Sequence, residues 1–159
     1  MEIVEYQKKY EPDFVRLNTD WIKRYFVLED ADLDILDHVQ EWLEAGAMIF
    51  FAVDKEQVLA TCMALPLGND IWEICKLAAA GQHTGTGAGS AVFKRSMDYA
   101  LTHGAKKLTL ISNRRLKQAL HIYRKFGFLE VPLNKAYWGY DRADIEMEYI
   151  PQSTQHIPS

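Results

Sequence analysis

Apolar residues recur along the chain at two spacings, and each spacing predicts one kind of element. Spacing of three and four residues is typical of the buried face of a helix. Gly46, Gly104 and Gly127 follow three such runs and are expected to end them. The pattern predicts four helices, marked by Phe14, Leu17, Trp21 and Tyr25; by Leu33, Leu36, Val39 and Leu43; by Val92, Phe93, Met97, Ala100 and Leu101; and by Leu116, Ala119, Leu120 and Tyr123.

Short runs rich in β-branched and aromatic residues predict the strands. A short strand is expected over 1–6, and further strands are expected over 106–112, 128–131 and 144–150. Three runs in the middle of the chain are separated by polar turns, which favours an antiparallel meander. These runs are AMIFFAV at 47–53, QVLATCMAL at 57–65 and IWEICKLAA at 71–79.

The order of these elements predicts a mixed sheet with a central β-α-β unit. The chain of 159 residues is 48% hydrophobic and 25% charged, which is typical of a folded domain; we expect one domain over 1–150 and a polar tail over 151–159. The longest stretch without Asp, Glu, Lys or Arg, 77–93, is interrupted by glycines, so no membrane span is expected. Cys62 and Cys75 lie in apolar runs, which favours free thiols and hence a reducing, cytoplasmic location.

Four of the nine glycines fall within the segment AGQHTGTGAG at 80–89, between an expected strand and an expected helix. A glycine-rich turn at a helix N-terminus presents backbone N–H groups to phosphate oxygens. The dinucleotide pattern G-x-G-x-x-G fails because Ser90 stands where the third glycine is required, and the lysine of the P-loop pattern is missing. The segment therefore indicates a phosphate site of another kind, with a turn that binds no ligand as the alternative.

The stretch 73–131 combines a strand, this loop, a helix that ends before GAKKLTL at 104–110, and ALHIYRKFGFLEV at 119–131. The last segment resembles the signature A-x-x-x-Y-x-x-x-G-F, and the whole stretch resembles the core of the GNAT superfamily of acyl-CoA-dependent N-acyltransferases. This resemblance implies a single-domain fold of the α+β type within the α/β class. It implies a mixed, mostly antiparallel twisted sheet of about six to seven strands flanked by four helices.

The glycine loop fits the superfamily's pattern [QR]-x-x-G-x-[GA] in two registers. One is Gln82-x-x-Gly85-x-Gly87, and the other is Thr84-x-x-Gly87-x-Gly89, where Thr replaces the usual Gln or Arg. The second register gives the following helix the length that such proteins have, and we prefer it for that reason.

The resemblance implies acetyl-CoA as cosubstrate, with its pyrophosphate held by backbone N–H groups of the loop. It also implies that the pantetheine arm runs along the end of the strand before the loop and meets an amide side chain after the next strand. The cofactor-binding residues that follow from this are Leu77, Ala78, Ala79, Thr84, Gly85, Thr86, Gly87, Ala88, Gly89, Ser90, Asn113, Lys117 and Tyr123.

Two further residues match catalytic positions of the family. Glu73 is the only acid between Asp70 and Asp98, and burial in its apolar strand would raise its pKa toward that of a useful general base; a solvent-facing strand residue is the alternative. Tyr123 matches the tyrosine whose hydroxyl protonates the departing thiolate, although it also fits an aromatic core position.

Charge is distributed unevenly around a formal net charge of −4, which argues against a duplex nucleic-acid partner. The segment 29–44 is rich in acids, and no Lys or Arg occurs over 25–54; seven bases lie over 106–125, and no acid occurs over 99–129. The basic side would attract the CoA phosphates and the acidic side a cationic amine, or each is an ordinary solvated face.

We therefore expect an N-acetyltransferase that moves an acetyl group from acetyl-CoA to an amine acceptor, by direct attack in a ternary complex. A non-catalytic acyl-CoA-binding or sensing module and a nucleotide-binding enzyme are the alternatives. The five histidines lack zinc-site spacing, so no metal is expected. The segment YWGYDRAD at 137–144 is expected to be a loop that borders the acceptor pocket or forms a homodimer contact.

Overall fold

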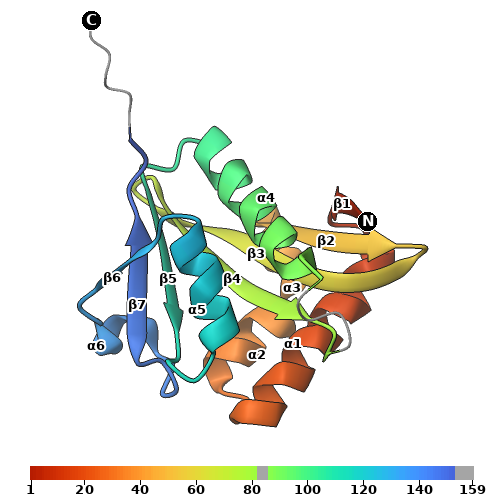
Figure 1. Ribbon diagram of the computed structural model, residues 1–159, viewed down its shortest axis with the longest axis horizontal. Coiled ribbons are helices and arrows are strands. Elements are labelled where there is room, and N and C mark those ends of the chain that lie inside the picture. Colours follow the sequence, from red (N-terminus) through yellow and green to blue (C-terminus); the bar gives the residue numbers. More distant parts are fainter. Residues whose placement is uncertain (82–85, 153–159) are drawn as a thin grey trace, which may run out of the picture.

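The computed structural model describes residues 1–81 and 86–152 and arranges them around one seven-stranded sheet of order β1-β2-β3-β4-β5-β7-β6 (Figure 1). The strands are β1 (Glu2–Glu5), β2 (Met48–Asp54), β3 (Gln57–Gly68), β4 (Ile71–Ala79), β5 (Lys107–Ser112), β6 (Leu129–Val131) and β7 (Ile145–Tyr149). The helices are the 3-10 turn η1 (Lys8–Tyr10), α1 (Glu11–Tyr25), α2 (Asp30–Leu36), α3 (Val39–Glu44), α4 (Ala88–Thr102), α5 (Lys117–Lys125) and α6 (Lys135–Trp138).

Neighbouring strands are antiparallel except for one pair in the middle of the sheet. Strands β1 to β4 form one antiparallel set, β5, β7 and β6 form a second, and β4 joins β5 in parallel. The predicted three-strand meander is confirmed as β2, β3 and β4, and the predicted mixed, mostly antiparallel sheet is confirmed with it.

Helices cover both faces of the sheet (Figure 1). Successive residues of β3 show the alternation, because Cys62 and Ala64 pack in the cluster under α4 and α5, whereas Met63 and Leu65 pack in the cluster under α1, α2 and α3. The protein therefore has two apolar layers, one on each face. Within the described residues, no helix is long and apolar enough to cross a membrane.

The second predicted helix is wrong in its extent. The apolar spacing from Leu33 to Leu43 predicts one helix, but the chain forms α2 and α3, with His38 between them at φ −135° and ψ 36°. Leu36 and Val39 on either side of the break are both buried, so the two short helices present the apolar face that one longer helix would present. The described residues hold six α-helices, four of them of seven residues or more; α6 is an additional short helix that overlaps the first two residues of the segment 137–144.

The two central strands separate soon after they meet. In the described residues, β4 and β5 pair over three positions, and the pairing ends at Glu73 opposite Thr109. Strand β4 continues to Ala79, and on the way Lys76 adopts φ 55° where the register against β3 shifts. Such a bulge bends a strand. A gap consequently opens between the carboxyl ends of β4 and β5.

Candidate active site

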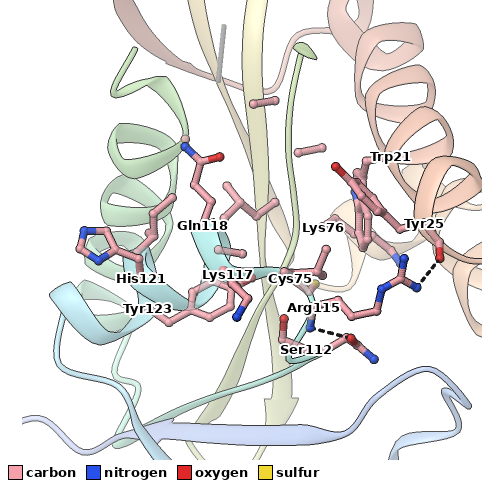
Figure 2. A pocket seen from close by; sticks show the side chains of 18 of the residues that line it. Trp21, Tyr25, Cys75, Lys76, Ser112, Arg115, Lys117, Gln118, His121 and Tyr123 are labelled. Carbon is pink, nitrogen blue, oxygen red and sulfur yellow. Dashed lines mark hydrogen bonds between the residues drawn. The ribbon is translucent and has the colours of Figure 1, made fainter. Parts of the chain in front are cut away.

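A pocket of about 670 Å³ occupies the gap between β4 and β5. Its walls come from β4, the start of α4, the end of β5, α5, α1 and the segment 140–143. Figure 2 shows Trp21 and Tyr25 of α1 on one side of the pocket and His121 and Tyr123 of α5 on the other. The pocket thus connects the two faces of the sheet.

One end of the pocket is the N-terminus of α4. Gly87 precedes the helix at φ 91°, and no side chain of the described residues caps it. The first hydrogen bond of the helix joins the Ala91 N–H to the Gly87 carbonyl (N···O 3.0 Å). The N–H groups of 88–90 therefore have no acceptor within the helix. Gly89 and Ser90 line the pocket, and Lys125 Nζ donates to Ser90 Oγ over 3.0 Å. Free N–H groups at the positive end of a helix dipole fit phosphate oxygens.

The predicted phosphate-binding residues fall into four groups. Ala88 is fully buried and offers its backbone alone. Thr86 is exposed and is not part of the pocket lining. Thr84 and Gly85 lie outside the described residues. The predicted loop residues that line the pocket are Gly87, Gly89 and Ser90.

The long wall of the pocket is the edge of β4 beyond Glu73. Leu77, Ala78 and Ala79 all line the pocket, as the resemblance implies for the pantetheine arm. On its other side β4 remains paired with β3 through Ala78 and Ala79. In the described part of the chain no strand pairs with the pocket-facing edge, so an extended ligand with amide groups can lie along it.

Asn113 and Lys117 line the pocket from the other side, after β5 and at the start of α5. The Asn113 side chain already makes two hydrogen bonds, because Nδ2 donates to the Arg142 carbonyl over 2.7 Å and Oδ1 accepts from the Arg115 N–H over 2.8 Å. One Nδ2 hydrogen is left for a ligand. Lys117 is exposed at the pocket rim.

Glu73 lies at the point where β4 and β5 separate. Its side chain lines the pocket, yet the residue is only 8% exposed. Burial raises the pKa of Glu73 from 4.5 to about 7, although the nearby charge of Lys76 acts in the opposite direction. A carboxyl group with this pKa takes up and releases a proton near neutral pH, as a general base must.

Tyr123 faces Glu73's strand from α5. It is 8% exposed, lines the pocket and packs against Phe93 with ring centroids 5.1 Å apart. Burial raises the pKa of Tyr123, so its hydroxyl stays protonated and available as a donor. The residue is thus both a core aromatic and a pocket residue, and the two readings of the sequence do not exclude each other.

The end of the pocket beside α1 holds a buried charge cluster that sequence reasoning missed. Asp32 is fully buried, and its carboxylate accepts from Lys76 Nζ at 2.8 Å and from both terminal nitrogens of Arg142 at 2.6 and 2.8 Å. Glu29 also accepts from Arg142, at 3.3 Å, and Tyr140 bonds to Lys76 at 3.2 Å. Burial alone would raise the pKa of Asp32, but the Arg142 hydrogen bonds and the Lys76 charge outweigh it and lower the pKa to about 2.

A signal for this cluster was present in the sequence. Lys76 is the only basic residue in a mostly apolar strand, and a lysine at such a position needs a buried partner. Asp32 lies three residues after Glu29, the spacing of the capping box that the two residues form at the start of α2. The spacing does not reveal that the same carboxylate pairs with Arg142, which lies 110 residues further along the chain.

The acidic segment 29–44 does not face the pocket. Two of its acids, Glu29 and Asp32, are paired in the cluster, and the other five are exposed: Asp30, Asp34, Asp37, Glu41 and Glu44. Among the described residues, Glu73 is the only acid in the pocket lining. The expectation that this segment draws a cationic amine toward the site is therefore not supported. The segment 137–144, in contrast, does border the pocket through Tyr140 and Arg142.

The described residues contain no group of three or more His, Cys, Asp or Glu side chains that could hold a metal ion. Around the pocket they bring together a buried carboxyl, a protonated phenol and a set of backbone donors.

Comparisons with known proteins agree with this geometry. The model of the acetyltransferase (GNAT) family matches residues 14–128. N-acetyltransferase family 8 member 2 of Rattus norvegicus is 24% identical over 114 residues, which are 68% of this chain and 50% of that protein. The chain thus spans about half the length of this curated relative.

Solved structures share the fold over nearly the whole chain. A GNAT-family acetyltransferase from Staphylococcus aureus Mu50 is 15% identical, with a TM-score of 0.83 over 94% of this chain and 98% of that one. An aminoglycoside 6'-N-acetyltransferase complexed with coenzyme A is 15% identical, with a TM-score of 0.73 over 94% of this chain and 97% of that one. GNAT enzymes use acetyl-CoA, and the uncapped α4 N-terminus of this chain fits its phosphates. The family match covers well over half of the chain, and the protein belongs to the GNAT family of acetyltransferases.

Proposed function

We propose that this protein transfers an acetyl group from acetyl-CoA to a primary amine of a small molecule or a protein, with residues 1–150 as the catalytic domain. The observation that carries the proposal is one pocket that joins the N-terminus of α4 to the buried carboxyl of Glu73 along an edge of β4; among the described residues, no side chain caps that helix and no strand pairs with that edge. Membership of an acetyltransferase family supports the same reaction.

The proposed pose of acetyl-CoA follows the pocket from end to end. The pyrophosphate binds the backbone N–H groups at the start of α4, with Lys125 and Lys117 close by. The pantetheine amides pair with the β4 edge at 77–79 and with the Asn113 side chain. The thioester then reaches the point where the strands separate, beside Glu73.

The proposed reaction is direct attack in a ternary complex. Glu73 accepts a proton from the ammonium group, directly or through water, and the neutral nitrogen attacks the thioester carbonyl carbon. A C–N bond forms, the C–S bond breaks, and the Tyr123 hydroxyl donates its proton to the departing thiolate. The acceptor's second N–H proton then restores the tyrosine. General acid and base catalysis of this kind contributes about 10²–10⁴-fold, and holding the two reactants in line contributes more.

The state of Cys75 supports direct attack over an acetyl-cysteine intermediate. Its thiol lines the pocket, but burial raises the pKa of Cys75 well above that of a free thiol. Because the thiolate is the nucleophilic form, this burial suppresses attack by the cysteine. A Cys75→Ala enzyme is expected to retain its activity, and initial-velocity plots against both substrates should intersect rather than run parallel.

The test of the proposed function is release of free CoA thiol from acetyl-CoA on addition of amines. In wild type, kcat/KM should rise with pH through about 7, the pKa of Glu73. Glu73→Gln should lose activity mostly above that pH, where the wild-type carboxylate is ionised, and Tyr123→Phe should lower kcat without weakening acetyl-CoA binding. Glu148→Gln and Tyr99→Phe are matched controls, because neither residue lines the pocket.

Two results would contradict the proposal. If the protein binds acetyl-CoA but releases no thiol with any amine, it is a non-catalytic acyl-CoA-binding module. If ATP or NAD raises its melting temperature and CoA does not, the pocket belongs to a nucleotide-binding protein.

A further inference from the structure

The acceptor end of the pocket has aromatic walls and an arginine. Trp21 and Tyr25 of α1 and Tyr140 line it. Figure 2 shows Arg115 extending from the loop before α5 toward α1, in the space beside Trp21 and Tyr25. Its Nη1 donates to the Tyr25 carbonyl over 3.1 Å, and its guanidinium carbon lies 5.2 Å from the centroid of the Phe26 ring.

The charges at this end do not balance. Lys76 and Arg142 are neutralised by Asp32 and Glu29 in the buried cluster, so they present no net charge to the pocket. Within the described part of the chain, Arg115 has no carboxylate within ion-pair distance. A second cation, Arg24, also lines the pocket, but its guanidinium lies next to Gly81, at the start of the glycine loop. Apart from Glu73, which the proposed reaction uses, no described acid offsets these cations.

From this arrangement we infer that the acceptor is an α-amino acid with an apolar or aromatic side chain, whose carboxylate binds Arg115. The inference rests on the proposed function and names its substrate class. A guanidinium presents five N–H donors in a planar fork that matches a carboxylate, and the bond to Tyr25 occupies one nitrogen. The aromatic walls suit an apolar side chain, and a polycationic amine would be repelled.

Arg115 is not placed to serve the CoA phosphates. The phosphate end lies at the N-terminus of α4, on the face that α4 and α5 cover, with Lys125 beside it. Arg115 instead reaches the carboxyl end of α1, which covers the opposite face. A role in acceptor binding and a role in CoA binding therefore predict different kinetic effects for the same substitution.

The first experiment compares amino acids with their decarboxylated amines: phenylalanine with phenethylamine, leucine with isoamylamine, and tryptophan with tryptamine. With rates corrected for the fraction of free amine, kcat/KM should be at least about tenfold higher for the amino acid of a pair, the value of one charge-assisted bidentate contact. Spermidine serves as the polycationic comparison. Equal rates within the pairs, or faster acetylation of spermidine, would overturn the inference.

The second experiment changes the arginine. Arg115→Gln should lower the ratio of kcat/KM for phenylalanine to that for phenethylamine by about tenfold or more. Arg114→Gln is the matched control, because Arg114 pairs with Glu130 outside the pocket and its loss should leave the ratio unchanged. If Arg115→Gln raises the KM for acetyl-CoA and keeps the ratio, the arginine serves the cosubstrate and the inference is wrong.

A binding measurement separates this inference from the proposed function. Calorimetric titration of phenylalanine and of phenethylamine into the complex with CoA requires no turnover. Tighter binding of phenylalanine, lost in Arg115→Gln, supports the inference even if no thiol is released, in which case only the proposed function fails. If neither compound binds, or both bind equally, the inference fails whatever the activity.

Discussion

The two ends of the pocket differ in what forms them. The α4 end offers backbone N–H groups from consecutive residues, 88–90, behind one left-handed glycine. The α1 end is formed by side chains from distant segments, and the Asp32 carboxylate that holds it together bonds to residues 44 and 110 positions away. The first end depends on local conformation, whereas the second depends on the complete fold. Substitutions at the two ends should therefore differ in how they affect stability and binding.

The difference extends to electrostatics. Backbone N–H groups do not titrate, so the donors of the α4 end do not change with pH. At the α1 end, charges are buried and opposed, and each depends on a partner that must stay ionised. Glu73 lies between the two ends, and its pKa is raised because burial disfavours its charged form.

The largest effect is expected at the buried cluster. Asp32→Asn removes a carboxylate that neutralises Lys76 and Arg142, and breaking a buried pair from one side costs about 3–5 kcal/mol of unfolding free energy. Urea denaturation at neutral pH measures this loss. The control is Asp34→Asn, an exposed acid on the same helix, which should change the unfolding free energy by less than about 0.5 kcal/mol.

The same carboxylate makes a pH prediction. The folded-state pKa of Asp32 is about 2 against 3.8 for the free side chain, so its contribution is present above about pH 4 and is lost as the pH falls toward 2. Between about pH 4 and pH 2, the unfolding free energy of wild type should fall by about 2 kcal/mol more than that of Asp32→Asn. Parallel pH profiles for the two proteins would mean that the cluster does not stabilise the fold through this charge.

The next largest effect is expected at Glu73, between the two ends, where substitution should increase stability. Because the pKa of Glu73 rises from 4.5 to about 7 on folding, the folded state holds a proton that the unfolded chain releases, and stability falls as the pH rises through this window. Glu73→Gln should therefore be more stable than wild type by roughly 1–3 kcal/mol at about pH 8, with no gain near pH 4. Thermal denaturation at both pH values tests this, and a gain of equal size at both would reject the electrostatic cause.

A smaller effect on stability, but a specific effect on binding, is expected at the α4 end. Gly87→Val forces a β-branched residue to φ 91°, which costs about 1–2 kcal/mol and shifts the N–H groups that follow. The matched control is Gly104→Val, because Gly104 has φ 93°, open space around it and a place outside the pocket. Both variants should lose similar stability, and only Gly87→Val should weaken acetyl-CoA binding, by about tenfold or more.

What the sequence predicts follows the same division between local and distant features. The strands, the α4 N-terminus and the pocket positions of Glu73 and Tyr123 could be predicted, because each depends on a local pattern or a contiguous motif. The break at His38 could not, because α2 and α3 keep one apolar face. The partners of Asp32 could not be predicted either, since helix periodicity gives an acid's position along the helix and not the residue it meets across the fold.

The smallest effect is expected at the rim of the α4 end, where Lys125 Nζ donates to Ser90 Oγ from an exposed position. Lys125→Met should raise the dissociation constant of acetyl-CoA by no more than about fivefold, because an exposed charge contributes at most about 1 kcal/mol, and the change should shrink as salt is added. Lys94→Met is the control, since Lys94 pairs with Asp98 on the outer side of α4 and does not line the pocket. If Lys125→Met weakens binding as strongly as Gly87→Val and added salt removes the difference from wild type, side-chain charge rather than backbone donors governs this end of the pocket. Both ends of the pocket would then depend on side-chain charges, and they would differ only in where they lie.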